Sequence, residues 1–235
     1  MAEEIEYWDF ATQDELTEQL VGDIGFIIES ALDARGQALL AFPGGSTPKP
    51  VFAGLAKANI RWKNVTIIPT DERLVPVDSP LSNIALIAKT FLPLGARVLP
   101  LNSEAENYTL AGSAANARLM DLHWPPDLVW LGMGKDGHTA SIFPGPDMEG
   151  AIHADKGVRA VGVMPDPLPP EAPVARVTLT AEAIASARTT IIVGGGRDKK
   201  TVLDKAIEEG ARSAFPIGRI LDRIEIPVDI YWLDS

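Results

Sequence analysis

The 235-residue chain contains no cysteine, which excludes disulfide bonds, a thiolate nucleophile and cysteine-ligated metal sites. It has three histidines, His123, His138 and His153, and their spacing does not match that of zinc ligands, so we expect no metal. The lack of cysteine is typical of a cytoplasmic protein. The acidic start of the chain, residues 1–8, also lacks the layout of a signal peptide.

Basic residues are scarce relative to acidic ones: 21 Lys and Arg face 32 Asp and Glu, giving a formal net charge of -11. A nucleic-acid-binding protein normally carries a basic stripe, and this sequence has none. No apolar run approaches membrane-spanning length. We therefore expect neither nucleic acid nor a membrane as a partner, and we expect a monomer. An anionic ligand would have to be bound by a few local cations.

Strand-like and helix-like segments alternate along the chain, which indicates an α/β fold with a mostly parallel sheet covered on both faces. We expect one domain spanning residues 1–235. The predicted strands are 5–10, 37–42, 65–69, 98–101, 128–131, 158–163, 176–179, 190–193 and 226–233. The predicted helices are 12–35, 48–56 with Thr47 as N-cap, 82–91 with Ser82 as N-cap, 104–122, 181–187 and 197–209.

Glycine-rich or charged turns follow four of the predicted strands, directly after Phe42, Pro69, Leu131 and Val193. The carboxyl ends of parallel strands meet at one edge of the sheet, where α/β proteins bind their ligands. The four turns can therefore converge on one cleft.

The turn after Leu131 has the most chemically informative side chains. Residues 132–141 read Gly-Met-Gly-Lys-Asp-Gly-His-Thr-Ala-Ser, which places Asp136 and His138 on a glycine-rich loop. The block matches the spelling of a dinucleotide fingerprint, but Pro144 and Pro146 prevent the long helix that should follow. It also resembles a P-loop without the lysine. A histidine on such a loop is often an ordinary surface residue. Whether this loop is a functional site therefore depends on what the remaining turns contain.

The turn after Phe42 is a candidate phosphate cradle, because bare amides, hydroxyls and a helix start favour an anion. Its residues are Gly44, Gly45, Ser46 and Thr47. Two cations stand on the other turns: Arg73 could grip a phosphate in a bidentate way, and Lys199 lies in a first helical turn. Each feature has a plainer interpretation, namely a capped turn, an internal Arg73–Asp71 pair, and a surface lysine.

Five blocks taken together resemble the 6-phosphogluconolactonase family, and they occur in that family's order over most of the chain. The blocks are residues 43–48, residues 71–76 with Ser82-Asn83, residues 132–141, residues 176–180 and residues 196–199. The resemblance implies a Rossmann-like three-layer α/β sandwich and hydrolysis of 6-phospho-D-glucono-1,5-lactone to 6-phosphogluconate, with no cofactor. It also implies that His138 is the general base, and that Arg73 and Lys199 bind phosphate beside the Gly44–Ser46 turn.

Other roles remain open at this point. Asp136 either orients His138 or binds a sugar hydroxyl, and Asp71 is placed with the substrate-binding residues. Arg176 either closes the site or is structural. Loop amides near Gly134 to Gly137 are candidate donors to an oxyanion. Residues 147–173 match no part of the family pattern that assigns a role.

Two other functions compete with the lactonase. A glucosamine-6-phosphate deaminase would share the fold, but the central block ends in Gly-His-Thr-Ala-Ser-Ile-Phe-Pro and lacks the acidic residue that resemblance to deaminases would require there. A non-catalytic sugar-phosphate sensor on the same fold would have no need for His138.

Overall fold

The computed structural model describes residues 4–102, 105 and 107–234. Within these residues, seven parallel strands form the central sheet in the order β1-β10-β9-β6-β2-β3-β5. The strands are β1 (Ile5–Phe10), β2 (Ala38–Phe42), β3 (Val65–Pro69), β5 (Arg97–Val98), β6 (Leu128–Leu131), β9 (Thr190–Gly195) and β10 (Val228–Leu233). Strands β2 and β6 are buried along their whole length, as parallel strands covered on both faces should be. The predicted parallel α/β sheet is confirmed.

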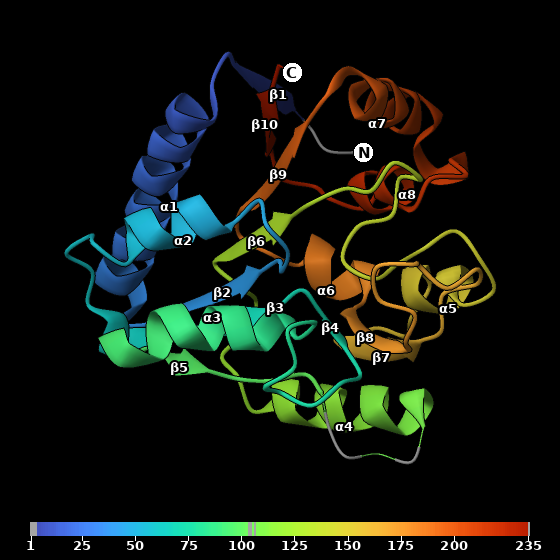
Figure 1. Cartoon of the computed structure of the whole chain (residues 1–235), viewed down its shortest axis with the longest axis horizontal. Coiled ribbons are helices and arrows are strands. Elements are labelled where there is room, and N and C mark those ends of the chain that lie inside the picture. Colours follow the sequence, from blue (N-terminus) through green and yellow to red (C-terminus); the bar gives the residue numbers. More distant parts are fainter. Residues whose placement is uncertain (1–3, 103–104, 106, 235) are drawn as a thin grey trace.

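Helices cover both faces of this sheet and make it the middle of three layers (Figure 1). Successive side chains of a strand point to opposite faces. Leu40 and Phe42 accordingly pack in one core cluster with α1, α2 and α3, whereas Leu39 and Ala41 pack in the other with α4, α6, α7 and α8. The helices are α1 (Gln13–Arg35), α2 (Lys49–Leu55), α3 (Asn83–Phe91), α4 (Tyr108–Met120), α5 (Met148–Ile152), α6 (Ala181–Ala185), α7 (Arg197–Glu209) and α8 (Pro216–Leu221), with 3-10 turns at Trp62–Asn64, Leu92–Leu94 and Gly210–Arg212.

A second, antiparallel sheet of three strands lies beside the main one, in the order β4 (Asp71–Arg73), β8 (Arg176–Leu179) and β7 (Ala160–Val163). The segment 71–73, which we expected to be part of a loop, is strand β4. Its hydrogen-bonding partner β8 lies about a hundred residues further along the chain, so local sequence could not indicate the pairing. The pairing sets Arg73 directly opposite Arg176.

Most predicted helix ends are confirmed. Thr12 and Glu15 form a capping box at the start of α1, Gly36 ends α1 in the left-handed conformation, and Ser82 caps α3. Thr47 is not a cap: α2 begins after Pro48 and has no side-chain capping bond.

Several other boundaries differ from the predictions. Helix α4 starts at Tyr108 with Asn107 as its cap, not at residue 104, which lies outside the described residues. Strand β5 falls at Arg97–Val98, earlier than predicted, where it can pair with β3. Helices α5 and α8 were not predicted, because both are short and lie in segments rich in Pro and Gly. Among the described residues, no helix is both long and apolar enough to cross a membrane.

Candidate functional site

The four turns that follow β2, β3, β6 and β9 meet at one edge of the sheet and line a single cleft of about 470 Å³. This convergence was predicted from the position of the four turns after strands of a parallel sheet. Most predicted site residues line the cleft: Gly44, Gly45, Thr47, Asp71, Arg73, His138, Arg176 and Lys199. Ser46 is exposed and does not line it, and Asp136 contacts His138 instead of the cleft. Glu171, from the unassigned loop, also lines the cleft.

Internal hydrogen bonds fold the loop that carries His138 into a compact shape. The Gly134 amide donates to the His138 carbonyl at 2.9 Å, and the Gly137 amide donates to the Gly134 carbonyl at 3.1 Å. The Thr139 hydroxyl donates to the Gly132 carbonyl at 2.7 Å. The amides of Gly134 and Gly137 are therefore engaged within the loop, which removes them from the predicted oxyanion donors.

His138 is oriented by Asp136. The His138 Nδ1 atom lies 2.6 Å from Asp136 Oδ1, and the His138 amide donates to the same oxygen at 3.2 Å. Burial opposes ionisation of Asp136, but hydrogen bonding and charge attraction from His138, together with backbone amides, outweigh it and lower the pKa of this carboxyl. An ionised carboxylate accepts a hydrogen bond from Nδ1–H, which leaves Nε2 as the basic nitrogen. No described group is hydrogen-bonded to Nε2, and the His138 side chain is 26% exposed.

Arg73 is fixed on one side and free on the other. Its Nη1 atom donates to the Leu81 carbonyl at 2.8 Å and to Asn83 Oδ1 at 2.9 Å. Its Nε atom is buried and has no partner among the described residues. No ion pair joins Arg73 to Asp71 in the described part of the chain, so the internal pairing considered above does not form. A guanidinium held this way presents an unused donor edge.

Arg176 is a second cation of the same kind. It is 3% exposed, its Nη2 donates to the Ala172 carbonyl at 3.0 Å, and its Nε is also buried without a described partner. Burial lowers the pKa of this guanidinium, an effect that Arg73 reinforces and Asp71 opposes. Like charges directly opposite each other in an antiparallel pair are destabilising. An anion bound between Arg73 and Arg176 would relieve that repulsion.

Asp71 and Asn83 connect the turns around Arg73. The Ser141 hydroxyl donates to Asp71 Oδ2 at 2.5 Å, which joins the loop after β6 to β4. The Asn83 side-chain amide donates to the Asp71 carbonyl at 2.8 Å while its oxygen accepts from Arg73. Sequence analysis did not assign Asn83 a role; its presence in the Ser82-Asn83 block was the signal that could have done so.

Lys199 is the cation contributed by α7. Its neighbour Lys200 is paired with Asp9 at 2.6 Å, whereas no described acidic group pairs with Lys199, which lines the cleft. The N-cap of α7 is Gly196, which offers no side-chain capping bond to the first amides of the helix. Unpaired amides, a helix N-terminus and a lysine together favour an anion.

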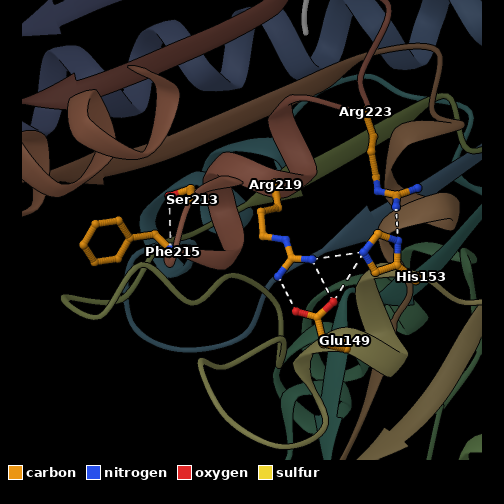
Figure 2. Close-up of polar contacts among 6 residues, drawn as sticks. All are labelled: Glu149, His153, Ser213, Phe215, Arg219 and Arg223. Atoms are coloured by element: carbon orange, nitrogen blue, oxygen red, sulfur yellow. Dashed lines mark hydrogen bonds and ion pairs between the residues drawn. The ribbon is translucent and has the colours of Figure 1, made fainter. Parts of the chain in front are cut away.

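Helix α8 supports the His138 loop from behind. The Ile217 amide donates to the Gly137 carbonyl at 3.1 Å. A side chain at Gly137 would collide with the Phe215 side chain. The Phe215 amide in turn donates to the Ser213 hydroxyl at 3.1 Å. Figure 2 shows how α8 and the turn after it are tied to α5 and its C-cap, His153. The clamp consists of a two-pronged Arg219–Glu149 pair at 2.5 and 2.8 Å and an Arg223–His153 bond at 2.7 Å.

Metal ligands do not gather anywhere in the described part of the chain: no three His, Asp or Glu side chains there could hold an ion together. The cleft is lined by one imidazole, three cations, the carboxylates of Asp71 and Glu171, and glycine-rich backbone. Such a set of groups can bind a phosphate and remove a proton from water nearby.

Comparison with known proteins gives consistent results. A family model described as glucosamine-6-phosphate isomerases/6-phosphogluconolactonase matches residues 11–232. A 6-phosphogluconolactonase of Mesorhizobium japonicum is 37% identical over 229 residues, covering 95% of this chain and 93% of that protein.

Solved structures extend the likeness to the whole fold. The crystal structure of a 6-phosphogluconolactonase from Shewanella baltica aligns with a TM-score of 0.89 at 32% identity, covering 99% of each chain. The three-dimensional structure of 6-phosphogluconolactonase from Trypanosoma brucei aligns with a TM-score of 0.83 at 28% identity, covering 98% of this chain and 96% of that one. With a family match over nearly its full length, the chain belongs to the glucosamine-6-phosphate isomerase/6-phosphogluconolactonase family.

Proposed function

We propose that this protein hydrolyses 6-phospho-D-glucono-1,5-lactone to 6-phosphogluconate, with His138 as the general base. The observation that carries the proposal is that Asp136 orients an imidazole whose free nitrogen shares a cleft with Arg73, Arg176 and Lys199. The relatives named above act as lactonases according to their names, which supports the same substrate class.

The phosphate of the substrate is assigned to Arg73 and Lys199, beside the Gly44–Gly45 turn. Arg73 lines the cleft and its Nη2 makes no hydrogen bond to a described residue, and Lys199 adds a charge at the start of α7. Anchoring one end of a flexible sugar phosphate places its carbonyl near His138 and so reduces the entropy that is lost on reaching the transition state. Asp71 is assigned to the sugar, because its carboxylate lines the cleft next to Arg73.

The reaction is a water attack on the lactone carbonyl carbon. His138 Nε2 takes a proton from the water as its oxygen bonds to C1, and the carbonyl oxygen becomes an oxyanion. The tetrahedral intermediate then breaks its bond between C1 and the ring oxygen, and the imidazolium returns its proton to that oxygen. Arg176 is our candidate for stabilising the oxyanion, because it is a buried cation that lines the same cleft as His138.

The test is lactone hydrolysis coupled to 6-phosphogluconate dehydrogenase, with the lactone generated in place, EDTA present, and spontaneous hydrolysis as the baseline. We expect a wild-type rate well above baseline. His138→Ala should lower kcat by about 10²–10⁴-fold, the usual contribution of a general base. Lys199→Ala should raise KM by about 10-fold or more with a smaller change in kcat, as expected for a lost charged hydrogen bond.

Two outcomes would contradict the proposal. A wild-type rate at baseline would leave only the fold and the phosphate site in common with the lactonases, and ammonia release from amino-sugar phosphates would be tested next. Full activity in His138→Ala would show that His138 is not the general base. A sensor would instead bind the sugar phosphate equally well with and without His138.

A further inference from the structure

We propose that Phe143 is a positioning residue for His138: its ring holds the imidazole in place and stabilises the imidazolium that forms when His138 removes a proton from water. The inference rests on the proposed lactonase function. It adds a residue that does not touch the substrate, since Phe143 is not among the described residues that line the cleft.

The contact between the two rings is close and nearly parallel. The ring centroids of His138 and Phe143 lie 4.1 Å apart with an angle of 23° between the planes. Asp136 fixes one edge of the imidazole through Nδ1, and Phe143 covers one face of it. With an edge and a face both held, the ring has little freedom to turn its Nε2 away from the cleft.

A tight turn brings Phe143 back beside His138. The Ile142 amide donates to the Thr139 carbonyl at 2.9 Å, and these two residues form an isolated antiparallel bridge. Ala140, at the tip, has a φ of 49°, in the left-handed region that residues other than glycine seldom adopt. Residues 138 and 143 directly flank the bridge and therefore face each other across it.

The tip of the turn is fixed to two other strands. The Ser141 amide donates to the Thr178 hydroxyl of β8 at 3.1 Å. The Ser141 hydroxyl donates to Asp71 of β4. The stacking of the two rings is thus set by a strained and anchored backbone, which is how structures maintain functional geometry.

The charges around His138 explain why an aromatic face is useful there. The face of a phenyl ring attracts a cation within about 6 Å, and the Arg176 guanidinium carbon already lies 5.2 Å from the Phe143 centroid. Several cations needed for an anionic substrate oppose formation of an imidazolium. The charged groups that share its surroundings are Asp136 on its own loop, and Arg73, Asp71, Glu171, Arg176 and Lys199 around the cleft.

Phe143→Leu tests this role because it removes the ring and keeps an apolar side chain. We expect kcat to fall about 10-fold with KM within about twofold, and the acidic limb of the pH–rate profile to move to lower pH, since the imidazolium loses its favourable face. Phe143→Tyr keeps the ring and should stay within about threefold of wild type. Phe91→Leu, the same change in a core away from the cleft, should alter neither kcat nor the profile.

A second readout is independent of turnover. NMR titration of the His138 ring should shift in the same direction in Phe143→Leu and remain at the wild-type position in Phe143→Tyr. If the leucine variant does not fold, Phe143→Met removes the ring in its place. Wild-type kcat and an unchanged titration in the variant without the ring would overturn the inference. So would an effect on KM alone, or equal losses in the leucine and tyrosine variants. Failure of the proposed lactonase function would be distinguishable, because the wild-type protein would then hydrolyse the lactone no faster than the spontaneous rate.

Discussion

Single residues decide the geometry of this site through what they lack as much as through what they carry. Gly134 has no side chain, and the space a side chain would need is occupied by His138 and Asp136. A Cβ atom at Gly134 would lie 2.2 Å from the His138 ring and 2.6 Å from Asp136 Oδ1. Glycine is required there because neighbouring atoms leave no room for a Cβ atom. The backbone of Gly134 is not in the left-handed region, so its conformation alone would not demand glycine.

Gly134→Ala should therefore inactivate the enzyme by displacing His138. We expect kcat to fall at least about 100-fold, because misplacing a reacting group by about 1 Å has effects of this size. Kinetics of the purified variant measure it. The matched control is Gly150→Ala on α5, where an added methyl group would meet nothing within 4 Å. A Gly134→Ala enzyme with wild-type kcat would show that His138 can move without consequence.

At the scale of elements, one buried carboxylate joins β4 to α3 and so determines where Arg73 lies. Glu72 is fully buried and accepts hydrogen bonds from the amides of Arg73, Asn83 and Ile84, each at 2.8 Å, and from the Ser82 hydroxyl at 3.1 Å. Burial raises the pKa of this carboxyl, while the three amides act in the opposite direction. Glu72 thus satisfies amides at the start of α3 that would otherwise be unpaired.

Glu72→Ala should be one of the more destabilising substitutions in the chain. Leaving several buried amides without an acceptor is expected to reduce the free energy of unfolding by about 2–4 kcal/mol. Urea denaturation followed by circular dichroism measures this change. KM should rise as well, because the Arg73 amide loses its hydrogen bond to Glu72 and the position of Arg73 is less well fixed. Glu18→Ala on the exposed face of α1 is the control, and an equal effect of the two substitutions would argue against the role given to Glu72.

At the scale of the whole molecule, the C-terminal strand β10 lies between β9 and the N-terminal strand β1, so the two ends of the chain lie side by side in the sheet (Figure 1). Tyr231 of β10 fixes this arrangement to α1: its hydroxyl donates to Asp23 at 2.8 Å, and the side chain is 4% exposed. Burial, together with the hydrogen bond and negative charge of Asp23, raises the pKa of the Tyr231 phenol well above its usual value.

The raised pKa predicts a loss of stability in alkali. Above about pH 10 an unfolded tyrosine releases its proton while the folded one retains it, so the unfolded state binds fewer protons and stability falls as pH rises. Tyr231→Phe should lose about 1 kcal/mol at neutral pH and show a weaker decline above pH 10. Urea denaturation of both proteins at pH 7 and pH 10.5 compares them. Parallel declines would assign the alkaline sensitivity to other groups.

The sequence by itself determined the alternation of elements and the place of the chemistry. Apolar strand segments such as residues 128–131 have few alternatives to a buried parallel strand. Once the strands are parallel, the turns after them must share an edge. His138, Arg73 and Lys199 could therefore be assigned to one cleft from the sequence, and the cap of α3 at Ser82 followed from local capping chemistry.

Only the tertiary structure decided which atoms are free to act. The pairing of β4 with β8 sets Arg73 opposite Arg176, and nothing within the segment 71–73 reveals a partner so distant in the chain. The same holds for Asn83, which bridges Asp71 and Arg73, and for Phe143, which stacks on His138 after a strained turn. Local sequence limits the conformation of each segment, but contacts between distant segments depend on how all of them pack at once.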